Sequence, residues 1–152
     1  MQVTVRRATL NDAATLAALR LKALAEGLGY TRTDGVAFAQ LFSAWMGEHL
    51  STHLPFVAEV DADVVGAAWL MVAERVPSPE RRYRRHGDVQ SVYVVPELRN
   101  RGIGVALLEA VLAEAATLDL EHVTVHSSDR AVPVYERVGF QHDRRWLHWK
   151  PE

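Results

Sequence analysis

The sequence of 152 residues contains no cysteine. A chain without cysteine cannot use a thiol nucleophile, and it cannot hold an iron–sulfur cluster, a cysteine-ligated zinc ion or a disulfide scaffold. Lysine is scarce as well, since the chain has fifteen arginines but two lysines, and the formal net charge is −2. Because this balance shows no basic excess, nucleic acid is not predicted as a partner.

Long hydrophobic runs are also missing. The longest apolar stretch, around residues 64–73, falls well short of the ~20 residues that a membrane span needs. The first residues alternate like a strand and lack the apolar run of a signal peptide. We therefore expect a cytoplasmic protein with no membrane partner. An apolar content of 49% and a charged content of 24% are typical of globular proteins, and the length predicts a single domain over residues 1–152.

The spacing of apolar residues predicts a mixed α/β fold. Strands are expected at 2–7, 55–60, 64–73, 88–95, 122–127 and 144–150, and helices at about 13–27, from Asp34 onward, at 102–118 and at 130–138. The second and third strands are joined by a short turn, which predicts a hairpin. The strand at 64–73 is apolar at nearly every position, which is typical of a central strand. Because the later strands alternate with helices, a parallel pair is expected there, so the sheet should be mixed.

Residues 75–87 are interpreted as a mobile connector between two strands. Four arginines stand between positions 81 and 85. Two interpretations stay open for this cluster: a solvated loop, or a lid that attracts an acidic acceptor.

One segment combines a strand end, two arginines and two glycines directly before an apolar helix. Pro96 stops the strand, and the run Arg99-Asn100-Arg101-Gly102-Ile103-Gly104 follows. Free N–H groups at a helix start carry partial positive charge, glycine lets the backbone approach a ligand, and arginine adds full charges. The segment therefore predicts an anion site that suits pyrophosphate. It is not a Walker loop, because no lysine follows the glycines, and Leu107 stands where a dinucleotide fingerprint needs a small residue.

The pattern Arg99-x-x-Gly102-x-Gly104 resembles the cofactor loop of the GNAT superfamily of acyl-CoA-dependent N-acyltransferases. A second segment, Tyr135-Glu136-Arg137-Val138-Gly139-Phe140, resembles the family's Tyr-Glu-x-x-Gly-Phe helix end, and the expected element order also matches. The resemblance spans essentially the whole chain. It implies a GNAT fold, with a central mixed sheet flanked by helices and a splayed strand pair that holds the cofactor. It also implies N-acetyltransferase activity, in which an acetyl group passes from acetyl-CoA, the co-substrate, to a primary amine of a small molecule or peptide.

The resemblance assigns cofactor contacts residue by residue. Arg99 would contact the diphosphate, with Asn100, Arg101, Gly102, Ile103 and Gly104 completing the anion site. The backbone of the strand at Val92, Tyr93 and Val94 would pair with the pantetheine arm. Ser128 stands where many relatives carry asparagine, so a cap for the following helix is expected of it together with a contact to the cofactor.

The resemblance also assigns two catalytic groups. The N–H of Val94 would stabilise the oxyanion. Tyr135 would protonate the leaving thiolate, because a phenol with a pKa of ~10 is protonated near neutral pH. Since position 135 also fits the buried face of a short helix, a purely structural tyrosine is the alternative.

Other assignments stay open. The general base is one of Glu74, His86, Asp88 and His126, or a water molecule. His49 and His53 have a spacing compatible with zinc on a helix, but no catalytic Glu accompanies them, so no metal is predicted. In relatives the two early helices form the acceptor wall, so Tyr30 and Trp45 are expected there. A catalytically silent acyl-CoA-binding module is the rival function, and a homodimer stays open.

Overall fold

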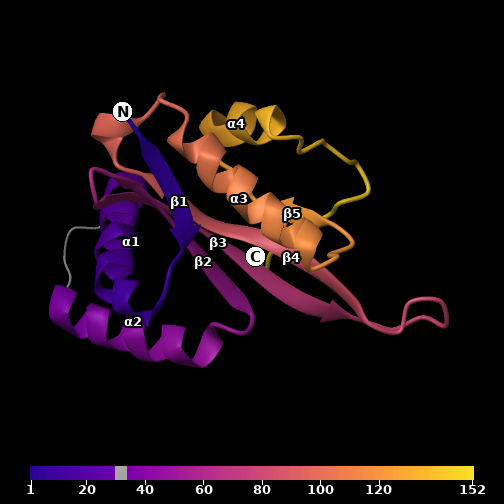
Figure 1. Ribbon diagram of the computed structural model, residues 1–152. Coiled ribbons are helices and arrows are strands. Elements are labelled where there is room, and N and C mark those ends of the chain that lie inside the picture. The colour runs from indigo at the N-terminus through magenta and orange to yellow at the C-terminus, as the bar shows by residue number, and fades with distance from the viewer. Residues whose placement is uncertain (30–33) are drawn as a thin grey trace.

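The computed structural model describes residues 1–29 and 34–152. In chain order the elements are β1 (Val3–Arg7), α1 (Ala13–Leu28), α2 (Gly35–His49), β2 (His53–Val60), β3 (Asp63–Arg75), β4 (Arg84–Val94), α3 (Ile103–Thr117), β5 (Val123–Val125) and α4 (Val132–Arg137). Helices α1 and α2 lie on one side of the sheet, and α3 and α4 lie on the other (Figure 1). The mixed α/β architecture predicted from the sequence is confirmed.

The sheet has the strand order β1-β2-β3-β4-β5. The pairs β1–β2, β2–β3 and β3–β4 are antiparallel, whereas β4 and β5 are parallel. The prediction of a mixed sheet is therefore correct, and β3 is the central strand, as its apolar sequence indicated. Residues Asp61 and Ala62, both with positive φ, form the turn of the predicted hairpin between β2 and β3.

Local sequence explains where the early helices begin and end. Helix α1 stops at Gly29, whose φ of 67° is a left-handed conformation that glycine adopts without strain. Helix α2 begins after Asp34, whose carboxylate accepts hydrogen bonds from the N–H groups of Val36 and Ala37, each at 3.1 Å. These two bonds satisfy donors that would otherwise be unpaired at the helix start.

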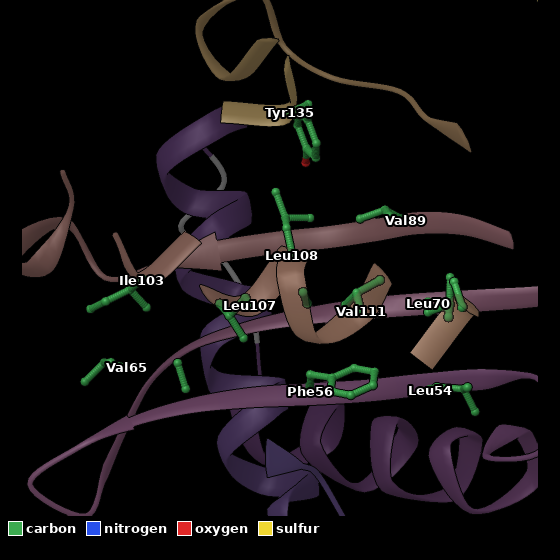
Figure 2. Packing of buried hydrophobic residues seen from close by; sticks show 13 residues of the cluster. Leu54, Phe56, Val65, Leu70, Val89, Ile103, Leu107, Leu108, Val111 and Tyr135 are labelled. Carbon is green, nitrogen blue, oxygen red and sulfur yellow. The ribbon is translucent and has the colours of Figure 1, made fainter. Parts of the chain in front are cut away.

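Two apolar layers hold the sheet between the helices. On one face, side chains of β2, β3 and β4 pack against α3 (Figure 2), where Leu107, Leu108 and Val111 are fully buried. On the other face, α1 and α2 cover Val57 and Trp69. Each such side chain stabilises the fold by roughly 1.5–3 kcal/mol on burial, so the strands that carry the site are fixed from both faces.

The expected strand at 144–150 is absent, and the reason is local. The carboxylate of Asp143 accepts hydrogen bonds from the backbone N–H and the side chain of Arg145, and its carbonyl accepts one from the N–H of Trp146. The chain therefore turns where the strand would begin. Trp146 packs on the ring of His122 at 4.5 Å, while Leu147 is 89% exposed.

The connector between β3 and β4 is shorter than the sequence indicated. Strand β3 continues to Arg75 and β4 already begins at Arg84, so the connector covers residues 76–83 instead of 75–87. It projects from one end of the sheet (Figure 1). None of the helices in residues 1–29 and 34–152 has the length and apolar character to cross a bilayer.

Candidate active site

The pairing between β4 and β5 stops partway along β4. The two strands pair only at Gly87 with Val123, Asp88 with Thr124 and Val89 with Val125. Strand β4 continues to Val94, so its residues 90–94 have no partner on the β5 side. The splayed strand pair that the family resemblance implied is present, and it opens one edge of β4 to a ligand.

The backbone of Val94 faces this opening. Its neighbour Val95 donates its N–H to the carbonyl of Val65, which precedes Gly66 on β3, at 2.9 Å. Because successive residues of a strand direct their backbone groups to opposite edges, Val94 points away from β3. Its carbonyl accepts a hydrogen bond from Nε of Arg99 at 3.0 Å, on the side of the opening. The N–H of Val94 points the same way.

A bulge in β4 lies next to the predicted pantetheine-pairing residues. The register between β3 and β4 shifts between Ala67 and Trp69, and Ser91 has a φ of 55°. Val92 follows Ser91, and Tyr93 restores the pairing with Ala67. Bulges bend a strand and are common next to active sites. The bulge marks the point on β4 where the sheet geometry departs from a regular ladder.

The loop before α3 has the form of an anion site. Asn100 and Gly102 both have positive φ, 62° and 83°, and Gly102 is the N-cap of α3. No side chain caps this helix, so the N–H groups of its first turn are without intrahelical partners. A Cβ added at Gly104 would meet nothing closer than 4.0 Å, and one at Gly102 would meet nothing within 4 Å. The space above both glycines is open to a ligand.

The guanidinium of Arg99 is bound to Glu26 of α1. It donates to both carboxylate oxygens of Glu26, with the Nη2–Oε2 bond at 2.9 Å, and Tyr93 donates its hydroxyl to the same carboxylate at 3.1 Å. The pKa of Glu26 is lowered by the hydrogen bond from Arg99. Burial and the contact with Glu26 raise the pKa of Tyr93. Arg101 is exposed at the loop tip, and no ion pair among the described residues involves it.

Tyr135 lies on α4, and its hydroxyl is directed toward β4 (Figure 2). It is 9% exposed and packs edge-on against Phe140 at 5.5 Å. Burial raises its pKa, so the phenol stays protonated near neutral pH. Its hydroxyl forms no hydrogen bond with another side chain in the part of the chain that the structure describes. The ring is part of the core, as the structural alternative required, yet the hydroxyl is available to a ligand.

Two other sequence predictions have mixed outcomes. Ser128 occupies a cap position before the 3-10 turn Asp129–Ala131, but its side chain makes no capping hydrogen bond, so that part of the prediction was wrong. The base candidates do not converge. Asp88 accepts hydrogen bonds from Thr124 at 2.7 Å and from Gln90 at 3.2 Å.

The other candidate bases are differently placed. Glu74 lies on β3 opposite Arg85, and it is exposed. His86 stacks on His122 at 5.1 Å, and its Nδ1 is buried without a hydrogen-bond partner. His126 is exposed at the end of β5.

A pocket of about 230 Å³ lies on the α1/α2 face and reaches the bulge in β4. Its lining residues are Arg20, Phe38, Leu41, Phe42, Trp45, His53, Trp69, Gln90 and Ser91. Trp45, expected in the acceptor wall, is among them, whereas Tyr30 lies outside the described residues. Arg20 was not predicted from the sequence. Its position three residues after Ala17 and four after Leu16, both buried, nevertheless places an arginine within an apolar helix stripe.

The arginine cluster at 81–85 has ionic partners on the α3–β5 connection. Arg84 binds Glu121 through two hydrogen bonds of 2.7 and 3.0 Å, and the pKa of Glu121 is lowered by this contact. Arg81 contacts Asp119 and Glu121, and Arg85 donates to the carbonyl of Leu118. These contacts tie the start of β4 to the segment before β5.

The histidines at 49 and 53 do not share a helix, because α2 ends at His49. The two rings lie 5.7 Å apart at an interplanar angle of 81°. Among residues 1–29 and 34–152, no group of three or more histidine or acidic side chains is placed to hold a metal ion. His53 lies at the start of β2. Its pKa is lowered mainly by burial and, to a smaller extent, by the electrostatic effect of His49.

Comparison with known families points to one group. A family model described as an acetyltransferase (GNAT) domain matches residues 31–145. The glucosamine 6-phosphate N-acetyltransferase of Trypanosoma brucei brucei is 32% identical over 83 residues. That match covers 54% of this chain and 54% of the relative, so only about half of each length is similar.

Solved structures resemble the chain along nearly its full length. A predicted acetyltransferase of Clostridium acetobutylicum, solved with acetyl-CoA, superimposes with a TM-score of 0.79 at 20% identity, covering 98% of this chain and 96% of that one. A GCN5-related N-acetyltransferase of Ralstonia eutropha JMP134 superimposes with a TM-score of 0.76 at 25% identity, covering 99% of each chain. The fold of this chain therefore occurs in solved structures described as acetyltransferases.

Proposed function

Because the chain belongs to the GNAT acetyltransferase family, we propose that it transfers an acetyl group from acetyl-CoA to the primary amine of a small molecule or peptide. The observation that carries the proposal is the opening on the β5 side of β4. The uncapped start of α3, the outward-facing backbone of Val94 and the hydroxyl of Tyr135 are all available to a ligand there. These are the groups that a diphosphate, a thioester carbonyl and a leaving thiolate require.

The loop and the opened strand would bind the two ends of the co-substrate. The free N–H groups at the start of α3, with Asn100, Arg101 and Ile103 around the two glycines, would hold the diphosphate. Backbone groups of Val92 and Val94 would pair with the pantetheine arm as an added strand does, whereas those of Tyr93, also expected there, face β3. Arg99 would form an ion pair with the diphosphate in place of its present ion pair with Glu26. Ser128 would line the pantetheine region.

Acetyl-CoA, once bound, supplies an acetyl thioester. The N–H of Val94 would donate a hydrogen bond to the acetyl oxygen as negative charge develops there. The amine nitrogen forms a bond to the acetyl carbon while the carbon–sulfur bond breaks. Tyr135 gives its proton to the departing sulfur and regains one from solvent, and the amine loses one proton. The products are the N-acetylated amine and the free thiol, with no covalent acyl-enzyme, in agreement with the absence of cysteine.

The amine proton would leave to water. None of Glu74, His86, Asp88 and His126 lines the pocket on the α1/α2 face. Asp88 is connected to the pocket indirectly, because Gln90, which lines the pocket, donates a hydrogen bond to its carboxylate. A water molecule at Gln90 would therefore connect the amine with solvent.

The role of Tyr135 is tested by Tyr135→Phe. Thiol release from acetyl-CoA is followed with a panel of amines, and coenzyme A affinity is measured by titration calorimetry. We expect kcat to fall by about 100-fold or more, the scale of a lost general acid, with unchanged coenzyme A affinity. Tyr83→Phe, in the exposed connector, is the matched control and should change neither quantity.

The outcomes of this experiment distinguish three hypotheses about the protein. Full activity of Tyr135→Phe would remove the acid role and leave the transferase in place. Binding of acetyl-CoA without turnover of any amine would favour a silent binding module. Absence of coenzyme A binding, with Gly104→Glu indistinguishable from wild type, would remove the proposal altogether.

A further inference from the structure

Aromatic side chains dominate the pocket on the α1/α2 face. Phe42, Trp45 and Trp69 lie with ring centroids 5.8 to 6.1 Å apart, mostly edge to face. Phe38 extends this wall, with its ring 5.8 Å from that of Phe42. The walls come from two layers, since α2 supplies three of these rings and β3 supplies Trp69. Such walls favour a flat or branched apolar group over a flexible polar chain.

Arg20 is the single permanent charge among the described residues that line the pocket. Its side chain is half-buried, and no ion pair among the described residues involves it. Most other arginines beside the sheet have a carboxylate partner, as Arg99 and Arg84 do. A guanidinium in an apolar pocket that lacks a protein partner is suited to a carboxylate or phosphate of a ligand.

The lining contains no acidic side chain. The residues outside the structural description, 30–33, have the sequence Tyr-Thr-Arg-Thr and include no carboxylate either. His53 does not add a second cation, since burial lowers its pKa. A polyamine or an aminoglycoside would therefore bring several positive charges to a pocket whose described lining holds Arg20 and no carboxylate.

Size and position limit the acceptor further. About 230 Å³ is below the ~300–1,000 Å³ that is usual for drug-sized ligands. Gln90 and Ser91 line the pocket at the bulge in β4. The opening assigned to the thioester lies along the other edge of the same strand. An amine held against these residues lies at the part of the pocket nearest to the bound acetyl group.

From these observations we propose that the acceptor is a small primary amine with an aromatic or branched apolar body and one anionic group, which Arg20 binds. Phe42, Trp45 and Trp69 select the apolar body, and the amino group points to the bulge. This inference rests on the proposed function, because it names the amine that enters the same site. The bonds made and broken are those given above, and the anion takes no part in them.

The test uses acceptors that differ in one feature at a time. L-Phenylalanine carries a carboxylate, its phosphonate analogue carries a phosphate-like group, phenylethylamine carries no anion, and spermidine carries additional cations. Thiol release gives kcat and KM for each with wild type, Arg20→Gln, Arg20→Lys and the control Arg82→Gln, whose side chain lies in the exposed connector. Titration calorimetry of coenzyme A is run on every variant.

We expect L-phenylalanine or its phosphonate analogue to be the best acceptor. Arg20→Gln should raise its KM by about 10- to 100-fold, as expected for a lost charge-assisted hydrogen bond pair, with kcat largely retained. KM for phenylethylamine should stay unchanged, Arg20→Lys should recover part of the loss, and Arg82→Gln should behave as wild type. The preferred member of the anionic pair tells whether carboxylate or phosphate is the natural partner.

Three results would overturn the inference while the transferase stands. Spermidine could be acetylated as well as L-phenylalanine, Arg20→Gln could affect all acceptors equally, or neither anionic amine could be acetylated by protein that binds acetyl-CoA. Loss of coenzyme A binding in the wild type counts instead against the proposed function. The calorimetric control thus separates the two failures.

Discussion

Gly66→Ala tests how tightly β3 holds β4 at the site. Gly66 is buried on β3 opposite Val94. A Cβ at this position would lie 2.8 Å from the carbonyl oxygen of Tyr93 and 3.2 Å from Cδ1 of Leu107. The first contact involves backbone, and the second involves a fully buried side chain. Neither partner can move without displacing β4 or α3.

The expected cost follows from that geometry. Overpacking a core by one methyl group costs about 1–3 kcal/mol, and the backbone contact places Gly66→Ala toward the upper part of that range. For a chain of this length each kcal/mol lowers Tm by about 2–4 °C. Since β4 must shift to relieve the contact, coenzyme A affinity should fall as well.

Urea unfolding followed by circular dichroism measures the stability change, and titration calorimetry measures coenzyme A binding. Gly47→Ala is the matched control, because its Cβ would meet nothing closer than 3.8 Å and the residue lies inside α2. Replacing a helical glycine by alanine should stabilise the protein by about 0.5–1 kcal/mol. If Gly66→Ala unfolded at the same urea concentration as wild type, the close approach of β3 to β4 would be refuted.

Two further predictions concern ion pairs. Arg6 holds the pKa of Asp12 at about 2, below the usual 3.8, so this carboxylate stabilises the fold above pH 3.8 and loses its effect as the pH falls through about 2. Asp12→Asn should therefore cost about 1–2 kcal/mol in urea unfolding at pH 7, and a gap that persisted undiminished at low pH would contradict this cause. Glu26→Gln should tighten coenzyme A binding by about two- to fivefold in calorimetry, because Arg99 would no longer be shared with a carboxylate. Weaker binding would mean that Glu26 positions Arg99 for the diphosphate.

Sequence periodicity predicted the elements well where one local pattern determined them. The hairpin β2–β3 and the helix after Asp34 follow from short stretches that contain their own turn or cap. The prediction was wrong at Arg84 and Arg85, which belong to β4 and not to the connector. Charged residues next to a connector have the composition of a loop, so the sequence alone did not indicate a strand there. Their partners, Glu121 and the carbonyl of Leu118, lie more than thirty residues away.

The candidate site divides in the same way. The glycine loop and Tyr135 could be found because each belongs to a continuous motif. Of the pocket around Arg20 only Trp45 was expected, because its walls come from α1, α2, β2, β3 and β4 and no single segment of the sequence brings them together. Likewise, no pattern in the sequence links Glu26 with Arg99, which are brought together only by the packing of α1 beside β4.

The two sides of the sheet can be redesigned separately. Helices α3 and α4 lie on one face and α1 and α2 on the other (Figure 1), and β4 carries both the outward-facing backbone of Val94 and the pocket residues Gln90 and Ser91. Under the proposed function, exchanging residues on the inner side of α2 would alter acceptor choice while leaving the loop before α3 intact. An engineer could diversify α2 in a library and screen it against new amines with a single, unchanged acyl donor.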